Sequence, residues 1–213
     1  LGADLVSFTE VTPDNVYADK EVPYRYVVVV AIEMDREKAA TAPSREFGLE
    51  TANTTVEVSV LANRLADRIK ERGYDAVPGP GIGGPVDYPS LARMAGMGEF
   101  GRHGMLISPF SGACQRIAAV FTNLKLPVER SNPHEWVRDY CANCGRCIRA
   151  CPPSAIREDS APTRAGHYSC VETGKCLLYL VTHLGCSICV KVCPFTTRGY
   201  DRIKAAFDRS ASG

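Results

Sequence analysis

Nine of the ten cysteines lie between Cys141 and Cys193, and seven of these nine form two regularly spaced runs. A first run reads Cys-x2-Cys-x2-Cys-x3-Cys-Pro, and a shorter second run reads Cys-x2-Cys-x3-Cys-Pro. The first spacing is that of bacterial ferredoxins, where three cysteines bind one [4Fe–4S] cluster and the fourth binds a second cluster. A proline after a cysteine suits the first turn of a helix, because the missing N–H has no partner there. The pattern predicts a module that binds two [4Fe–4S] clusters and carries single electrons.

The crossing of the fourth cysteine assigns four ligands to each cluster. We assign to cluster one Cys141, Cys144, Cys147 and Cys193, and to cluster two Cys151, Cys186, Cys189 and one further residue. The second run has His183 where a cysteine would complete the first run's pattern. Cys176 is the nearer remaining cysteine and precedes a helical stretch, so we favour it as the eighth ligand. Cys170 and His183 are the alternatives.

Two other uses of cysteine fit this pattern less well. A structural zinc ion takes four ligands, usually as two Cys-x2-Cys pairs. A disulfide scaffold is typical of a short secreted chain, whereas Cys114 is the single cysteine before the two runs. We expect Cys114, and whichever of Cys170 and Cys176 binds no iron, to be ordinary thiols.

The elements that must position these cysteines indicate an α/β or α+β fold. Tyr24–Ile32 is β-branched, aromatic and almost wholly apolar, as in a central strand buried on both faces. Leu49–Arg72 has apolar residues at helical spacing and a charged opposite face. We predict a first domain over residues 1–133 and an iron–sulfur domain over residues 134–213.

Two glycine-rich segments interrupt the first domain. Pro78–Pro89 is dense in proline and glycine, which predicts a loop. The second segment, Gly96–Gly104, precedes two predicted strands at Met105–Ser108 and Arg116–Thr122. A loop as long as Pro78–Pro89 without elements of its own is either functional or disordered. Taken by themselves, the glycines of the second segment are best explained by tight turns in an ordinary fold.

Composition excludes some partners. The 213 residues carry 25 Lys and Arg against 24 Asp and Glu, a balance that gives no reason to expect nucleic acid. The longest apolar run, Val27–Ile32, is far too short to span a membrane. Oxygen-sensitive clusters favour the cytoplasm. The chain starts at Leu1 and not at Met, so export after removal of an upstream signal is the alternative.

Several stretches resemble the superfamily of reductive dehalogenases and epoxyqueuosine reductases, which are cobalamin-dependent iron–sulfur reductases. The resemblance spans nearly the whole chain. It is carried by Leu1–Val6, Tyr26–Ile32 with Met34 and Asp35, Ala95–Gly104 running into Met105–Pro109, Arg116–Leu126, and the cysteines with Lys175, Leu177, Pro194 and Phe195. The Gly98-Glu99-x-Gly101-Arg102 motif is closer to the dehalogenase branch. Phe195 departs from the tryptophan that is common at its position.

The resemblance implies a nitroreductase-like core that binds a corrinoid, followed by a ferredoxin-like domain with two [4Fe–4S] clusters. It further implies base-off cobalamin whose cobalt is reduced to Co(I) by the nearer cluster. Glycines allow close approach of backbone to a large cofactor. We expect corrinoid contacts from Gly98, Arg102, His103, Ser108, Gly112, Leu177 and Ser187. A flavin in the same core is a weaker alternative, because the first domain has no basic cluster suited to a flavin phosphate.

Reductive cleavage also needs a proton donor. The resemblance implies Tyr88, which lies at about the right distance before the glycine-rich motif for the dehalogenase tyrosine, with Asp87 beside it as the second candidate. A Tyr-Pro turn capped by the aspartate would explain the same residues without catalysis.

Two functions follow from this pattern. The first is a reductase that takes electrons from a low-potential ferredoxin or flavodoxin and acts on a small organic substrate. The second is a non-catalytic protein that transfers electrons to, or handles, the corrinoid of a partner protein. The chain lacks the insertions that usually cover the substrate pocket in this superfamily, which keeps the second hypothesis open.

Overall fold

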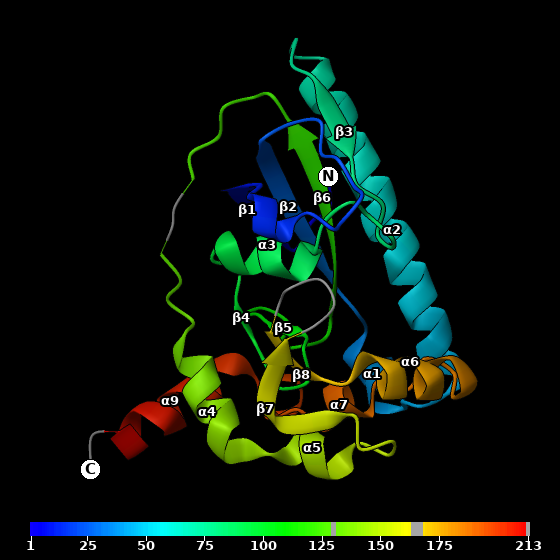
Figure 1. The fold of residues 1–213 in the computed structure, drawn as a ribbon, viewed down its shortest axis with the longest axis vertical. Helices are drawn as coiled ribbons and strands as arrows, with labels where there is room; N and C mark the ends of the chain where they lie inside the picture. The colour runs from blue at the N-terminus through cyan, green and yellow to red at the C-terminus, as the bar shows by residue number, and fades with distance from the viewer. Residues whose placement is uncertain (129–130, 163–167, 212–213) are drawn as a thin grey trace. The chain divides into compact units, whose positions relative to one another are not determined.

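The computed structural model describes residues 1–128, 131–162 and 168–211, and its chain forms two compact units (Figure 1). The first unit comprises Leu1–Glu33, Ala52–Met97 and Gln115–Pro133. The second comprises Met34–Thr51, Gly98–Cys114 and His134–Gly213. One boundary between the units falls between residues 133 and 134. Residues 34–51 and 98–114, which the sequence places in the first domain, join the second unit.

The first unit is built on a four-stranded antiparallel sheet. Its strands have the order β1-β2-β6-β3. They span Leu5–Glu10 (β1), Tyr26–Glu33 (β2), Ala76–Pro78 (β3) and Gln115–Thr122 (β6). The predicted central strand is β2, which pairs with β6 from Tyr26 opposite Thr122 to Glu33 opposite Gln115. Five consecutive residues of β2, at 27–31, are buried, as expected for a strand covered on both faces.

Helices pack against this sheet. The long helix α2 (Arg45–Lys70) contributes Val58, Leu61 and Ala62 to a core shared with Val28 of β2 and Val120 of β6. The short helix α3 (Tyr88–Met94) packs against β1, β2 and β6. A single turn of 3-10 helix, η1 (Pro13–Asn15), follows β1. Within the described residues, none of the helices combines the length and the apolar character needed to cross a bilayer.

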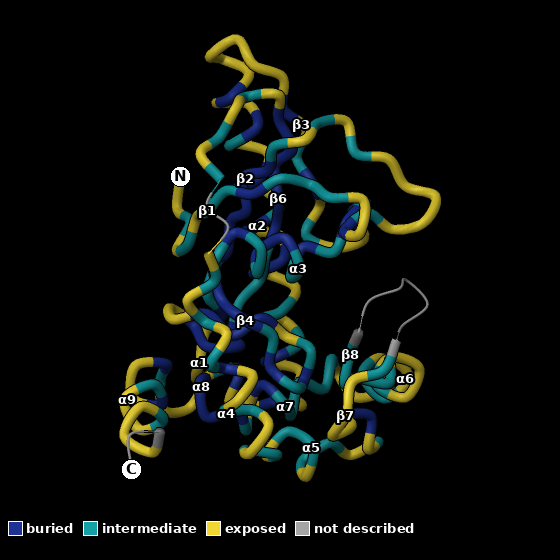
Figure 2. Tube along the Cα trace, turned by 60° about the vertical axis from the view of Figure 1, so that its left-hand side comes forward, coloured by how far each residue is buried: buried dark blue, intermediate teal, exposed yellow. Residues whose placement is uncertain are grey.

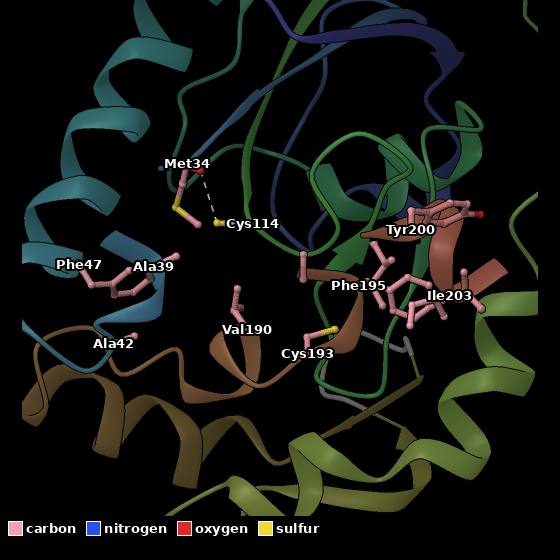
Figure 3. Close-up of a cluster of buried hydrophobic side chains, with 13 residues drawn as sticks. Met34, Ala39, Ala42, Phe47, Cys114, Val190, Cys193, Phe195, Tyr200 and Ile203 are labelled. Carbon is pink, nitrogen blue, oxygen red and sulfur yellow. Dashed lines mark hydrogen bonds between the residues drawn. The ribbon is translucent and has the colours of Figure 1, made fainter. Parts of the chain in front are cut away.

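The second unit consists of short elements around its own apolar core (Figures 2 and 3). Its helices are α1 (Arg36–Ala40), α4 (Trp136–Cys144), α5 (Arg146–Ala150), α6 (Thr173–Thr182), α7 (Ile188–Lys191), α8 (Pro194–Thr197) and α9 (Tyr200–Ala211), and its strands are β4 (Glu99–Phe100), β5 (Leu106–Ile107), β7 (Ile156–Pro162) and β8 (Tyr168–Val171). The strands form two antiparallel pairs, β4 with β5 and β7 with β8.

Aromatic rings fill one side of this core. Trp136 of α4 packs against Phe195, Tyr200 and Phe207, with ring centroids 5.7, 5.2 and 5.3 Å away. Its indole N–H donates to the hydroxyl of Tyr200 at 3.0 Å. Phe195 is fully buried and directly follows the last Cys-Pro pair, so the core fixes the position of Cys193 (Figure 3).

Candidate iron–sulfur centre

The first cysteine run winds through two short helices. Cys141 and Cys144 lie on α4, and Cys147 lies on α5. Gly145 between the helices has φ +60°, the left-handed conformation that glycine adopts at low cost and that ends α4. Cys151 follows α5 in an extended conformation. The run therefore turns sharply, so that its cysteines lie around a common loop.

The second run is a tight turn followed by two helical turns. Gly185, Cys186 and Ser187 all have positive φ values, at 84°, 41° and 59°. Such values are uncommon for residues other than glycine. Here they form the tight turn that holds Cys186 and leads into α7, on which Cys189 lies. Cys193 precedes α8, and Pro194 occupies the first turn of that helix, as the sequence predicts.

The structure brings the first group of thiols together. Burial raises the pKa of Cys141 to about 12, with further increases from Cys193, Cys147 and Cys144. Burial also raises the pKa of Cys193 to about 11, despite amide N–H donors at Phe195 and Thr196, and Cys147 and Cys144 raise it further. The four residues assigned to cluster one therefore lie within electrostatic range of one another.

A second group forms around Cys176 of α6. Burial raises the pKa of its thiol, and the neighbouring Cys151 and Cys186 raise it further. Burial raises the pKa of Cys189 to about 12, with additional increases from Cys147, Cys176 and Cys186. Cys189 thus lies near both groups, which places the two groups next to each other.

The donor set fits two [4Fe–4S] clusters. Among the described residues, no three side chains of the metal-binding types converge on a single ion. That is compatible with a cubane, because each of its four irons takes a different cysteine and the sulfurs stay apart. Buried thiols of raised pKa are protonated at neutral pH, and iron binding would displace those protons.

The alternative ligands have other surroundings. Cys170 lies on β8. The ring of His183 stacks on Tyr179 with centroids 3.7 Å apart, and its Nδ1 lies 2.9 Å from the Thr182 hydroxyl. Cys114 is fully buried, and its thiol donates to the carbonyl oxygen of Met34 at 3.6 Å (Figure 3). Cys114 is thus a buried thiol, and it lies among apolar side chains of the core.

The glycine-rich motif forms the β4–β5 hairpin, and this hairpin packs against α4. The carboxylate of Glu99, which is fully buried, lies 3.1 Å from the guanidinium of Arg138. Arg102 donates from Nε to the carbonyl of Cys141 at 3.2 Å and from Nη2 to that of Ala142 at 3.4 Å. The sequence did not predict either contact, because each joins segments about 40 residues apart.

His103 lies buried at the end of the same hairpin. Its Nδ1 accepts the backbone N–H of Met105 at 3.1 Å. Its Nε2 has no hydrogen-bond partner among the described residues. Burial lowers the pKa of the imidazole to about 4, so at neutral pH it is uncharged and Nε2 carries the proton. The ring presents one unused donor.

The glycines expected at a corrinoid are required by the protein's own packing. A Cβ at Gly98 would overlap the carbonyl group of Ile107. Gly112 has φ +61°, and a Cβ there would lie 2.6 Å from the carbonyl carbon of Phe195 and 2.9 Å from the nitrogen of Thr196. Close approach of backbone to backbone explains these two positions without a cofactor.

The other expected corrinoid contacts differ in their exposure. Ser108 is fully buried, and its hydroxyl oxygen lies 3.0 Å from that of the neighbouring buried Ser111. Ser187 donates its hydroxyl to the carbonyl of Gly185 at 3.0 Å. Leu177 on α6 is 54% exposed. Of these side chains, the exposed Leu177 is the most available for contact with another molecule.

The two candidate proton donors lie in the first unit. Tyr88 begins α3 and is buried, and its hydroxyl has no partner among the described residues. Burial raises its pKa to about 12. A Cβ at Gly79 or Gly84 would collide with this hydroxyl, so the proline- and glycine-rich loop makes room for the phenol. Asp87 accepts the hydroxyl of Ser90 at the start of α3.

Comparison with known proteins supports this site. Residues 136–178 match a family described as a 4Fe-4S dicluster domain. Over 181 residues, the chain is 34% identical to the tetrachloroethene reductive dehalogenase of Sulfurospirillum multivorans, covering 80% of this chain and 35% of that protein. It is 32% identical over 133 residues to an epoxyqueuosine reductase of Synechocystis sp., covering 54% of this chain and 41% of that protein. The chain is a homologue of reductive dehalogenases and epoxyqueuosine reductases.

Solved structures of both reductive dehalogenases and epoxyqueuosine reductases also match this chain. A reductive dehalogenase described as B12-dependent superposes on 97% of the chain with a TM-score of 0.83 and 25% identity, although the match covers only 32% of that protein. An epoxyqueuosine reductase bound to a tRNA stem loop superposes on 92% of the chain, and 62% of its own, with a TM-score of 0.63 and 17% identity. At that identity the second match shows the fold alone. The chain spans about a third of the length of its dehalogenase relatives.

Proposed function

We propose that this chain is a corrinoid-dependent iron–sulfur reductase of the reductive dehalogenase type, in which two [4Fe–4S] clusters deliver electrons to a base-off cobalamin. The observation that carries the proposal is the division of eight cysteines into two adjacent groups. The homology to reductive dehalogenases supports a role of these groups in reduction. The described relative's dependence on B12 supports the corrinoid.

Each cysteine group would hold one cluster. Cys141, Cys144, Cys147 and Cys193 would bind cluster one, and Cys151, Cys176, Cys186 and Cys189 would bind cluster two. The electrostatic proximity of Cys189 to both groups supports a short distance for electron transfer between the clusters. The electron donor would be a low-potential ferredoxin or flavodoxin, and the oxygen sensitivity of such clusters favours the cytoplasm.

A bound corrinoid would supply a strongly reducing cobalt centre. The fit of the described residues to this cofactor is uneven. His103 supports it, because a buried and unused N–H donor suits an amide side chain of the corrin ring. Gly98 and Gly112 give it no support, because protein backbone fills the space beside them. We keep a nitroreductase-like core as part of the proposal.

Tyr88 would donate the proton that a reductive cleavage requires. Its buried phenol keeps its proton at neutral pH, since burial raises its pKa to about 12, and its hydroxyl is not engaged by the described residues. Asp87 would then position α3 through Ser90. Tyr88→Phe should abolish turnover while leaving iron content and corrinoid binding unchanged; normal turnover by this variant would exclude the role.

Anaerobic reconstitution tests the proposal as a whole. Iron analysis should find about eight irons per chain, because each cubane holds four. Added cob(II)alamin should bind and be reduced by a low-potential donor, with small organic halides then tested for halide release. A result of about four irons per chain would contradict the assignment of two clusters. Failure to bind cobalamin, or binding of a flavin in its place, would contradict the assignment of a corrinoid.

A second candidate function is electron transfer to a partner corrinoid protein without turnover by this chain. The observation that favours it is the intramolecular explanation for Gly98 and Gly112, which were two of the expected corrinoid contacts. In that case the clusters would assemble and exchange electrons with a partner, while the chain alone would reduce no small substrate. The cobalamin-binding experiment separates the two functions.

A further inference from the structure

We propose that Arg102 raises the reduction potential of cluster one, by holding its positive charge beside that cluster's ligands, and that it does not anchor a corrinoid or a substrate. The inference rests on the proposed function, because it requires the assignment of Cys141, Cys144, Cys147 and Cys193 to one cluster. It gives a role to a residue of the glycine-rich motif whose contacts the sequence did not reveal.

The position of Arg102 carries the argument. Arg102 follows β4, and its guanidinium turns toward α4, where two of its N–H groups donate to consecutive carbonyls of Cys141 and Ala142. The side chain thus contacts the backbone of the first cluster ligand and of the residue after it.

These two bonds hold the positive charge of Arg102 beside the backbone of the first cluster ligand. A fixed cation favours a reduced cluster over an oxidised one, because reduction adds one negative charge close to it. Hydrogen bonds to cluster sulfurs and net charge are known determinants of iron–sulfur potentials.

The hairpin that carries Arg102 has a second attachment to α4. The buried carboxylate of Glu99, three residues earlier, pairs with Arg138, three residues before Cys141. This pair joins the same two segments as the bonds of Arg102. Two separate contacts therefore join the hairpin to α4, so the guanidinium of Arg102 is already in position before the cluster is reduced.

The consequence is a direction for electron transfer. Raising the potential of cluster one shifts the equilibrium of electron transfer between the two clusters toward a reduced cluster one.

Redox titration of Arg102→Gln, followed by EPR of the reduced clusters in the 213-residue chain, tests this role. Glutamine keeps a hydrogen-bond donor and removes the charge. At the wild-type midpoint potential of cluster one, the ratio of reduced to oxidised cluster should fall on the order of tenfold, which corresponds to about 59 mV. The signal of cluster one is the one that persists in Cys176→Ala. Arg202→Gln, which removes the same charge from an exposed position on α9, should leave this ratio unchanged.

Arg102→Lys separates charge from geometry. Lysine keeps the charge without the planar fork, so its midpoint should stay close to that of the wild type. If Arg102→Gln binds less iron, a midpoint of Arg102→Lys far from that of the wild type would by itself overturn the proposal. A wild-type midpoint in Arg102→Gln, or a shift in Arg102→Lys as large as that in Arg102→Gln, would overturn the proposal. A wild-type chain without two cluster signals would instead refute the proposed function.

Discussion

The two cysteine groups offer the same ligand chemistry in different surroundings. In the first group, Cys193 is 4% exposed and belongs to the apolar core, and the β4–β5 hairpin holds Cys141 through Arg102. In the second group, Cys176 lies on α6, whose neighbouring Leu178 and Val181 are 68% and 65% exposed. The difference teaches that spacing indicates which cysteines are candidate ligands, whereas the surrounding contacts set the rigidity and electrostatics of each site.

The largest expected effect separates the two groups by their iron content. Cys176→Ala should lose cluster two, and iron should fall from about eight to about four per chain, because a [4Fe–4S] cluster needs four thiolates. Cys170→Ala is the matched control and should keep all of its iron. Iron analysis and EPR after anaerobic reconstitution check both variants. A loss of iron in Cys170→Ala with none in Cys176→Ala would reverse the assignment.

Packing beside the first group predicts a large loss of stability. Gly112→Ala should lower the free energy of unfolding by about 3 kcal/mol, since the new Cβ meets the backbone of Phe195 and Thr196 at a positive φ. Gly174→Ala on α6 has nothing within 4 Å of its Cβ and should stabilise by about 0.5 kcal/mol. Urea denaturation under anaerobic conditions measures both. Equal effects at the two glycines would contradict the contrast in packing.

The hairpin of the first group should also respond to pH through His103. Burial lowers its folded pKa to about 4 from 6.5, so the unfolded chain takes up a proton first as pH falls. The stability that the neutral imidazole contributes to the folded chain is therefore complete above pH 6.5 and is lost as pH falls toward 4. Between pH 7 and 5, the wild type should lose about 2 kcal/mol more than His103→Gln. If the unfolding free energies of the wild type and His103→Gln changed in parallel with pH, the imidazole would have the same pKa in the folded and the unfolded chain, and the prediction would be wrong.

The ion pair that holds the hairpin should contribute less. Arg138→Gln should lower the free energy of unfolding by about 1 kcal/mol, because it removes the pair with buried Glu99, although the Arg138 side chain is 52% exposed. Arg68→Gln on α2 is the control, since the Arg68–Glu71 pair is about equally short but exposed at both ends. Its change should be about 0.3 kcal/mol. A larger effect at Arg68 would show that burial of Glu99 does not strengthen its pair.

Much of the fold could be predicted from local patterns. The apolar β-branched run predicted β2, and the helical spacing predicted α2, because both patterns record burial along one element. The joining of residues 34–51 and 98–114 to the iron–sulfur unit could not be predicted. It depends on which side chains meet in the core, such as Phe47 and Ile107 with Phe195, and one sequence does not reveal such distant pairs.

The sequence by itself determined the candidate cluster ligands, the family resemblance and the glycine-rich motif. Ligand spacing is readable because the covalent chain limits how far apart residues two or three positions away can lie. Only the tertiary structure decided what the motif contacts. It placed Glu99 against Arg138 and Arg102 against Cys141, and it filled the space beside Gly98 and Gly112 with protein. These choices depend on packing between distant segments, where many partners are compatible with the same local sequence and the shared core selects one.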